Sequence, residues 1–244
     1  MLQTTATPVD GGWSIDGRKW FITGAEGASF LICMARTGDG ATMFLVDEEN
    51  PGWHIDRLIA TNDRTFAGGH AELVFEDCRV SHDAVLGEVG GGFRAAQIRL
   101  APARLTHCMR WLGSARRAFD LAVARAKERE AFGGPLGDLG MVPERVARSL
   151  IDIETSRLLI CRCAWALDQG EPARHESSVA KAYVAEAVAR VIDRAVQICG
   201  ALGLSGDSIL SGLLNEARAF RIYDGPTETH LWAIGRRALW AEVK

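Results

Sequence analysis

The sequence predicts an α+β protein in which an antiparallel β segment, forming a sheet or part of a barrel, precedes an up-and-down four-helix bundle. Short alternating apolar runs bounded by turn residues fill the chain as far as Gly90–Gly92, and longer runs with helical periodicity follow. The charge changes at the same place, because residues 1–91 carry a net charge of −8 and residues 92–244 carry +5. We therefore expect a β domain over residues 1–91 and a helical bundle over residues 92–244.

The β domain is expected to hold five strands. Alternation of apolar and polar residues marks them at residues 13–15, 20–23, 30–35, 42–46 and 72–75. Asp16-Gly17 lies between the first two runs and is typical of a two-residue hairpin turn. The sequence therefore predicts that these two runs pair as an antiparallel hairpin.

Three long amphipathic helices are expected in the second domain, with shorter helices beside them. Apolar residues recur every three or four positions along one face of each long helix. These residues are Leu105, Cys108, Leu112, Ala115, Phe119 and Ala122 in the first helix; Ile151, Leu158, Cys161 and Trp165 in the second, which ends near Gly170; and Val184, Ala187, Val191, Ala195, Ile198 and Leu202 in the third. Pro143 and Pro226 suit first-turn positions of further helices.

The composition narrows the class of protein. Of the 244 residues 48% are hydrophobic and 24% charged, which excludes a disordered or collagen-like chain. The net charge of −3 argues against a nucleic-acid binder that relies on bulk positive charge. The chain has no apolar run of membrane-spanning length and no secretory signal at its start, so we expect a cytoplasmic protein without a membrane span.

The six cysteines give no sign of a metal site. They form no CxxC pair and have no metal-type spacing with histidine. Four of them, Cys108, Cys161, Cys163 and Cys199, fall in the helical runs among apolar neighbours. We expect these four to be buried, reduced thiols and expect no metal in the protein.

Five short strings are more specific than this general pattern. They are Gly17-Arg-Lys-Trp-Phe-Ile-Thr-Gly24, Val74-Phe-Glu-Asp-Cys-Arg-Val80, Arg129-Glu-Ala-Phe-Gly-Gly-Pro-Leu136, Gln197-Ile-Cys-Gly-Ala-Leu-Gly203 and Ile222-Tyr-Asp-Gly-Pro-Thr-Glu-Thr-His230. In this order and spacing they resemble the acyl-CoA dehydrogenase family of flavoenzymes, from about Gly12 to the C-terminus.

The resemblance implies FAD-dependent α,β-dehydrogenation of an acyl-CoA thioester. In that reaction a carboxylate removes the α-proton while the β-hydrogen leaves as hydride to the flavin, and an electron-transferring flavoprotein then takes the electrons. It also implies a homo-oligomer built as a dimer of dimers. The family's N-terminal helical domain and its Thr-Glu-Pro and Gly-Ser-Asp strings have no counterpart here. We expect an N-terminally truncated or partial chain; a subunit of a hetero-oligomer that supplies the missing domain and a degenerate relative are the alternatives.

The resemblance places the catalytic base at Asp224, where most of the family carries glutamate in a Tyr-Glu-Gly-Thr string. A carboxylate suits the task, because the α-proton of a thioester is weakly acidic and needs a base in a partly desolvated site. Asp224 also suits a turn ahead of Pro226, which is the structural alternative. Some family members carry the base on the first bundle helix, but Ala103 occupies that position here.

The remaining site residues are also implied by the resemblance. Arg104, Tyr223 and Gly225 match substrate-binding positions, although Arg104 equally suits a solvated helix face. Cofactor positions are matched by Phe21 and Thr23 at the isoalloxazine ring, Arg129 and Phe132 toward the FAD of a neighbouring subunit, Gln197, Gly200 and Gly203 at the adenylate part, and Thr227 and Glu228 at the adenosine. Phe21 in a strand core and Gly203 in a helix C-cap are the structural alternatives. His107 and His230 have no partner spacing that suggests a relay, so we expect both to be structural.

Two other functions stay open at this stage. One is a flavin oxidase of the same fold, similar to nitroalkane oxidase, which also uses an aspartate base. The other is a non-catalytic partner subunit that keeps the helical bundle. The electron acceptor separates the first from a dehydrogenase, and bound flavin separates the second. Asn215 and Pro226 depart from the family's usual residues, so the acyl chain is left unassigned.

Overall fold

The computed structural model describes residues 2–63 and 68–240. The chain divides into two compact units, Met1–Arg99 and Leu100–Lys244. The first unit is a sheet and the second is helical, so the predicted α+β class is confirmed.

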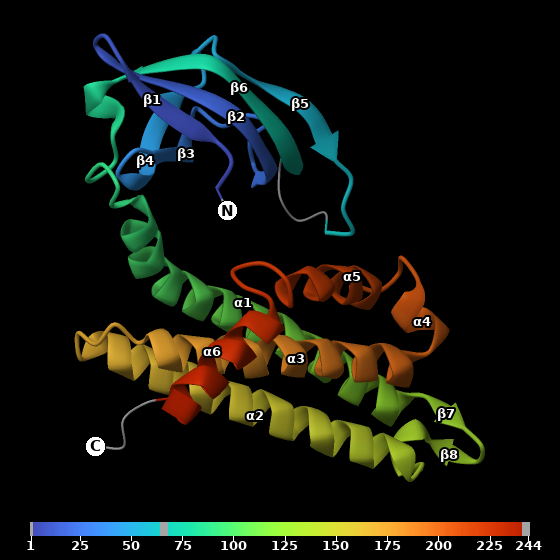
Figure 1. Ribbon diagram of the computed structural model, residues 1–244. Helices are drawn as coiled ribbons and strands as arrows, with labels where there is room; N and C mark the ends of the chain where they lie inside the picture. The colour runs from blue at the N-terminus through green and yellow to red at the C-terminus, as the bar shows by residue number, and fades with distance from the viewer. Residues whose placement is uncertain (1, 64–67, 241–244) are drawn as a thin grey trace. The chain divides into compact units, whose positions relative to one another are not determined.

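The sheet of the first unit has six strands in the order β4-β3-β1-β2-β6-β5 (Figure 1). The strands are β1 (Thr5–Val9), β2 (Gly12–Thr23), β3 (Phe30–Thr37), β4 (Gly40–Asp47), β5 (Trp53–Ile59) and β6 (His70–Ser81), followed by the 3₁₀ turn η1 (His82–Ala84). Neighbouring strands are antiparallel except for β1 and β3, which meet in parallel at Thr5 and Arg36. The predicted antiparallel segment is therefore a mixed sheet with one parallel contact.

The predicted hairpin at Asp16-Gly17 is wrong. β2 runs through these residues, and the register against β6 shifts between Ile15 and Gly17, which marks a bulge. Gly17 is needed there because its φ is +135° and a Cβ would lie 2.8 Å from the Cα of Thr4. The chain turns instead at Asp10-Gly11, where Gly11 has φ +78° and links β1 to β2. The polar, proline-containing β1 gave no alternation, so the earlier turn went unrecognised.

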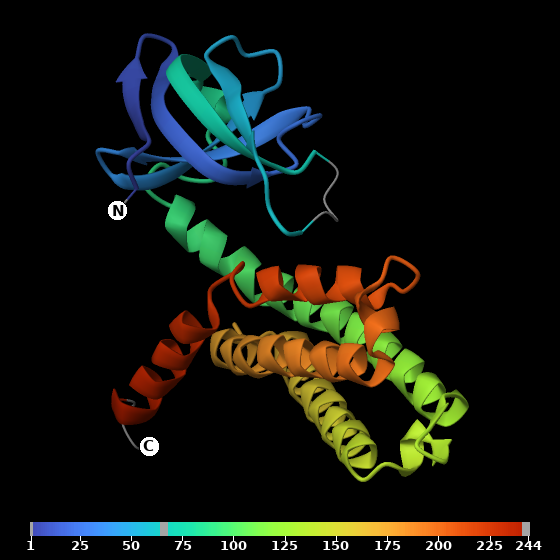
Figure 2. The ribbon, with the colours of Figure 1, turned by 90° about the vertical axis from the view of Figure 1, so that its right-hand side faces the viewer.

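The helical unit is built on three long helices. They are α1 (Gly92–Glu128), which begins in the first unit, α2 (Met141–Asp168) and α3 (Arg174–Cys199). Shorter elements complete it: β7 (Glu130–Ala131), β8 (Gly134–Pro135), η2 (Leu136–Asp138), α4 (Ala201–Leu204), α5 (Leu210–Phe220) and α6 (Thr227–Trp240). α2 packs against α3 and diverges from it away from the turn that joins them, and α5 and α6 pack on α3 (Figures 1 and 2). No helix among residues 2–63 and 68–240 is long and apolar enough to cross a membrane.

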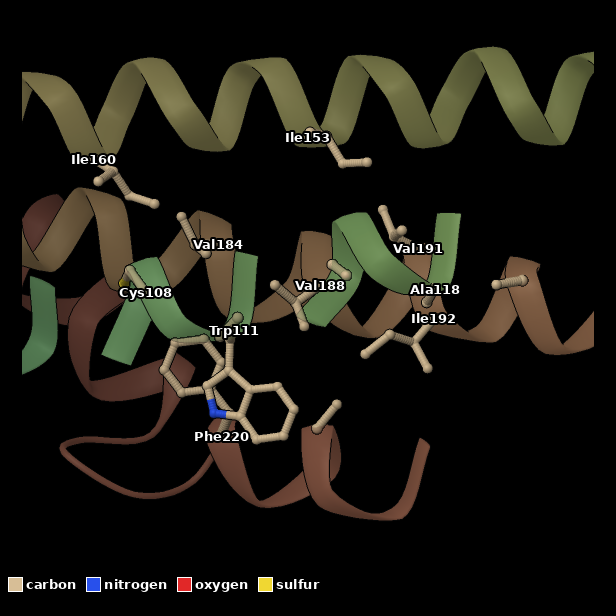
Figure 3. Packing of buried hydrophobic residues seen from close by; sticks show 14 of the residues in the cluster. Cys108, Trp111, Ala118, Ile153, Ile160, Val184, Val188, Val191, Ile192 and Phe220 are labelled. Carbon is tan, nitrogen blue, oxygen red and sulfur yellow. The ribbon is translucent and has the colours of Figure 1, made fainter. Parts of the chain in front are cut away.

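One apolar core holds these helices together, with Trp111 and Phe220 stacked at one side of it (Figure 3). The predicted face of α1 is buried at Leu105, Cys108, Ala115 and Ala122, with Leu112 and Phe119 half-buried. Every predicted α3 residue up to Ile198 is buried as well. Leu202 lies beyond α3, because the helix ends at Cys199 and Gly200 follows with φ +62°.

The predicted face of α2 is wrong. Ile151, Leu158, Cys161 and Trp165 are exposed, and the core is formed by Ile153, Ile160, Cys163 and Ala166. α2 carries apolar residues on two sides, so periodicity cannot tell which side meets the other helices. The expectation that Cys161 is buried fails for the same reason, whereas Cys108, Cys163 and Cys199 are buried.

Candidate active site

Asp224 lies in the loop that joins α5 to α6, and its backbone is in the left-handed region with φ +54°. A non-glycine residue with positive φ is strained, and this conformation persists only where its surroundings hold it. The next residue, Gly225, has φ +101°, and a Cβ at that position would lie 2.7 Å from Nε2 of His230. The loop therefore needs glycine after Asp224 and needs contacts that fix both residues.

Lys181 of α3 supplies two of these contacts. Its ammonium donates hydrogen bonds to the carbonyl oxygens of Phe220 at 2.8 Å and Gly225 at 3.2 Å, one at each end of the loop. The side chain is fully buried, and this burial lowers the pKa of Lys181 to about 8. Burial also raises the pKa of the neighbouring Cys108 thiol to about 12, so this cysteine stays protonated.

A row of side chains on α1 meets the same loop from another side. Arg104, His107 and Arg110 follow one another at intervals of three residues and so share one helix face. Arg104 Nε donates to the Asp224 carbonyl at 2.9 Å, and His107 Nε2 lies 3.1 Å from Asp224 Oδ2. Arg110 Nη2 lies 3.0 Å from the Tyr223 hydroxyl and 3.4 Å from His107 Nδ1.

Aromatic rings form one wall of this site. The Tyr223 hydroxyl accepts a hydrogen bond from the indole nitrogen of Trp111, and burial raises the pKa of Tyr223. The Tyr223 ring also meets His107 edge to face, with ring centroids 5.1 Å apart. The residue before Asp224 is thereby fixed by packing as well as by hydrogen bonds.

His230 lies under the loop and is 2% exposed. Its Nε2 donates to the Asp224 carbonyl at 3.3 Å, since a carbonyl oxygen can only accept. Burial, and after it the positive charges of Arg104 and Lys181, lower the pKa of His230 to about 4. His230 is therefore neutral at physiological pH, and its contacts agree with the structural role expected of it.

The beginning of α6 holds the two residues that follow this loop. Thr227 is buried, and its hydroxyl donates to Glu186 of α3 at 2.9 Å. Arg221 donates to the same carboxylate at 2.8 Å. Glu228 is exposed in the first turn of α6. Arg104, Tyr223, Gly225 and Asp224 thus come together, with Thr227 and Glu228 next to them.

The other predicted residues of the helical unit form a second group. Arg129 lies 25 positions after Arg104, which is about 37 Å along an α-helix. Phe132 follows in the hairpin of β7 and β8, with φ +55° and its ring 93% exposed. Gln197, Gly200 and Gly203 lie at the junction of α3 and α4. Burial raises the pKa of Cys199 at this junction and the positive charge of Arg125 partly offsets the rise, so the junction is close to the end of α1.

Phe21 and Thr23 belong to the first unit. Phe21 has φ +54° and is 55% exposed, at a second bulge of β2 where the register shifts between Lys19 and Ile22. The alternative that placed Phe21 in a strand core is therefore wrong. The Thr23 hydroxyl pairs with Nδ1 of His70 at 2.9 Å.

Two residues of the site were missed in the sequence. His107, which was expected to be structural, lies 3.1 Å from Asp224 Oδ2 across 117 positions of the chain. Lys181 gave no signal, since a lysine in a helical run is ordinarily solvated. The spacing of Arg104, His107 and Arg110 is a signal that could have indicated a polar face on α1.

Among the described residues, no three His, Cys, Asp or Glu side chains are grouped to hold a metal ion.

Comparison with known proteins identifies the family. The family model of the acyl-CoA dehydrogenase middle domain matches residues 1–78, and that of the acyl-CoA dehydrogenase C-terminal domain matches residues 90–239. The chain belongs to the acyl-CoA dehydrogenase family. A Mycobacterium tuberculosis relative, "Probable acyl-CoA dehydrogenase FadE2", is 40% identical over 99% of this chain. The match covers 62% of that relative, so the chain spans about three fifths of its length.

Two solved structures superpose closely on this one. Butyryl-CoA dehydrogenase from Megasphaera elsdenii gives a TM-score of 0.91 at 31% identity, over 98% of this chain and 63% of its own. A structure described as PigA with FAD and proline gives a TM-score of 0.93 at 25% identity, over 99% of this chain and 64% of its own. The sheet and the helices of this chain are therefore those of an acyl-CoA dehydrogenase.

Proposed function

We propose that this chain is the base-bearing part of an FAD-dependent acyl-CoA dehydrogenase, in which Asp224 removes the α-proton of an acyl-CoA thioester. The proposal depends on one observation above all. The Asp224 carboxylate, whose side chain is 18% exposed, is carried on a strained backbone that Arg104 fixes through the carbonyl and His107 meets at the side chain. Strain held in this way at a reactive group is typical of functional sites.

The surroundings of Asp224 suit a base that acts on carbon. The carboxylate can accept a proton at oxygen as the Cα–H bond of the thioester breaks, and partial burial limits the water that would compete for it. Arg104 and Gly225 would lie next to a bound thioester, and Tyr223 would be part of the cavity wall. Aspartate is one methylene shorter than glutamate, so the substrate has to approach the loop closely.

The residues of this chain fit FAD. The exposed rings of Trp20 and Phe21 leave apolar surface uncovered at the sheet, as expected for a face that stacks on a flavin. Gly200 has open space at its Cβ position, so a ligand can approach the backbone there. When bound, FAD would supply the acceptor for the β-hydride.

Two groups of residues would hold the cofactor. Phe21 would cover the isoalloxazine ring and Thr23 would bond to it. Arg129 and Phe132, together with Gln197, Gly200 and Gly203, would contact the FAD of a neighbouring copy, where an arginine suits the pyrophosphate. Thr227 and Glu228 would lie at the adenosine; since the Thr227 hydroxyl already donates to Glu186, its methyl group or backbone would make the contact.

The proposal extends to the whole protein. We propose that the chain functions in the cytoplasm as part of a homo-oligomer, a dimer of dimers, and passes electrons to an electron-transferring flavoprotein. Since the chain spans about three fifths of its relative, the rest of the substrate pocket would come from further sequence of the same protein or from a partner subunit.

The substitution Asp224→Asn tests the base directly. The variant keeps the size of the side chain but cannot accept the proton, so anaerobic bleaching of the flavin by an acyl-CoA is expected to be lost while the flavin absorbance is retained. Asp168→Asn, an exposed aspartate at the end of α2, is the matched control and is expected to bleach normally. Normal bleaching by Asp224→Asn would remove this residue from the mechanism.

An aspartate base also fits a flavin oxidase, which is the second candidate. The same protein mixed with acyl-CoA in air distinguishes the two, because an oxidase turns over with stoichiometric peroxide and a dehydrogenase requires an electron-transferring flavoprotein. Absence of bound flavin after reconstitution of the full-length protein would favour a non-catalytic partner subunit instead.

A further inference from the structure

We infer that His107 is a positioning residue for the Asp224 base: its Nε2 faces the carboxylate at close range and, once aligned, would donate a hydrogen bond that orients the reactive group. The inference rests on the proposed function of Asp224. His107 lies on α1, 117 positions before Asp224, and no local sequence pattern connects it with the α5–α6 loop.

The contacts define which nitrogen of His107 carries the proton. The Arg110 guanidinium has donors only, so at 3.4 Å from Nδ1 it faces that nitrogen as a donor. Nδ1 is then the acceptor, and Nε2 carries the hydrogen. Nε2 is 3.1 Å from Asp224 Oδ2, which is within hydrogen-bond distance, although the two groups are not aligned for a hydrogen bond in this structure.

His107 is itself held in place. Its ring meets Tyr223 edge to face at 5.1 Å, and Arg110, which faces its Nδ1, also lies 3.0 Å from the Tyr223 hydroxyl. The His107 side chain is 28% exposed, so it has little freedom to turn away from Asp224. Side chains locked in this way can hold a reactive group in a productive geometry.

Arg104 and His107 together hold Asp224 at two points from one face of α1. Arg104 bonds to the backbone carbonyl and His107 Nε2 meets the carboxylate, so both the main chain and the side chain of Asp224 are contacted from α1. A short aspartate needs this more than a glutamate does, because it has one torsion fewer with which to reach the substrate.

Substitutions at His107 test the inference in the full-length protein with FAD bound. His107→Leu removes the donor, and the rate of flavin bleaching at saturating acyl-CoA is expected to fall about 10- to 100-fold, as for loss of a hydrogen bond to a charged group, with little change in KM. In His107→Gln the amide nitrogen can donate from the position of Nε2, so most of the rate is expected to return. His175→Leu makes the same change on α3 and is expected to behave as the wild type.

A spectroscopic measurement does not depend on turnover. In protein labelled with ¹⁵N-histidine, the His107 signals are those absent from His107→Gln, and they are expected to show hydrogen on Nε2 and a bare Nδ1. Asp224→Asn is expected to move the Nε2 signal. A proton on Nδ1, or an Nε2 signal unmoved by Asp224→Asn, would overturn the inference.

The kinetic outcomes separate the inference from the proposed function. If Asp224→Asn abolishes bleaching and His107→Leu reacts at the wild-type rate, the base stands and His107 has no positioning role. A His107→Gln variant as slow as His107→Leu would also reject donation from Nε2. If Asp224→Asn bleaches normally, the proposed function itself fails.

Discussion

Lys181 shows at the scale of one residue how the fold holds the loop around Asp224. A lysine buried without a carboxylate partner ordinarily costs free energy, but here its ammonium satisfies carbonyl oxygens at both ends of the loop. Its ring contact with Phe220, 4.6 Å from Nζ to the centroid, adds a further attraction. A buried lysine is tolerated at this position because the carbonyl groups of the loop need a hydrogen-bond donor.

The ionisation of Lys181 predicts a pH dependence of stability. Its pKa is about 8 in the folded protein, against 10.5 ordinarily. Between these values the unfolded chain binds more protons than the folded one, so the stability that Lys181 contributes rises with pH and is lost as pH falls through about 8. The unfolding free energy of the wild type relative to Lys181→Met is therefore expected to increase by on the order of 1–2 kcal/mol from about pH 7 to about pH 10.

Urea unfolding of both proteins, followed by the helical circular dichroism signal, measures this difference. Other groups that titrate in the same range are common to the two proteins and cancel in the comparison. A difference that stays constant, or that falls with rising pH, would contradict the lowered pKa of Lys181.

At this scale the sequence pointed to Asp224 as the proposed base but not to the residues that contact it. Asp224 was identified through a string of local residues, which a resemblance can match position by position. His107 and Lys181 act on it from α1 and α3, and contacts over 117 and 43 positions leave no local pattern. The positive φ of Asp224 is likewise imposed by tertiary contacts, since aspartate has no requirement for it.

At the scale of the elements, α2 and α3 are joined by a buried ionic cluster. Asp152 of α2 is 6% exposed and accepts hydrogen bonds from Arg190 at 2.6 Å, Arg194 at 2.7 Å and Tyr183 at 3.2 Å, all on α3. Burial alone would raise the pKa of Asp152, but the two guanidinium groups outweigh it and hold the pKa below its ordinary value. The cluster fixes one register between two long helices that otherwise meet through apolar residues such as Ile153 and Val191 (Figure 3).

Loss of this charge is expected to be costly. Asp152→Asn leaves two arginines facing a neutral amide, and we expect the protein to lose about 2–3 kcal/mol of stability, less than a fully buried pair because Arg190 is 43% exposed. Chemical denaturation measures the loss. Glu154→Gln, an exposed site on the same helix, is the control and is expected to change stability by less than about 0.5 kcal/mol. Equal stabilities of the two variants would mean that the cluster contributes nothing.

α2 and α3 show where hydrophobic periodicity is sufficient to predict the buried face of a helix. α3 is surrounded by other helices and has one continuous buried face, so its stripe was predicted correctly as far as Ile198. α2 is apolar on two sides, and Asp152 lies on the side that meets α3. The sheet was predicted in part, because β1 and β5 contain few alternating apolar residues. The turn at Asp10-Gly11 was missed because a second Asp-Gly pair, Asp16-Gly17 within β2, matched the same hairpin pattern.

At the scale of the whole molecule, the second apolar side of α2 is exposed on the surface of the single chain. Ile151, Leu158 and Trp165 are 63%, 71% and 61% exposed and recur every seven residues, so they form one stripe along the helix. Contiguous apolar surface of this kind marks an interaction site in proteins that are otherwise polar outside. The proposed dimer of dimers assigns the stripe to a second copy of the chain.

A charge in this stripe tests the assembly. Leu158→Glu places a carboxylate in the centre of the apolar contact, where it would be desolvated without a partner, so the oligomer is expected to dissociate into smaller species. The helix itself should persist, because the site is exposed in one chain and glutamate is a good helix former. Size-exclusion chromatography with light scattering gives the mass, and Arg157→Glu, exposed on the same helix, is the control expected to keep the wild-type mass.

An unchanged mass for Leu158→Glu would mean that the interface lies elsewhere, and a monomeric wild type would mean that there is no such interface. Should the oligomer dissociate, loss of bound FAD alongside it would indicate that Arg129 and Phe132 serve the cofactor of a neighbouring copy, as proposed.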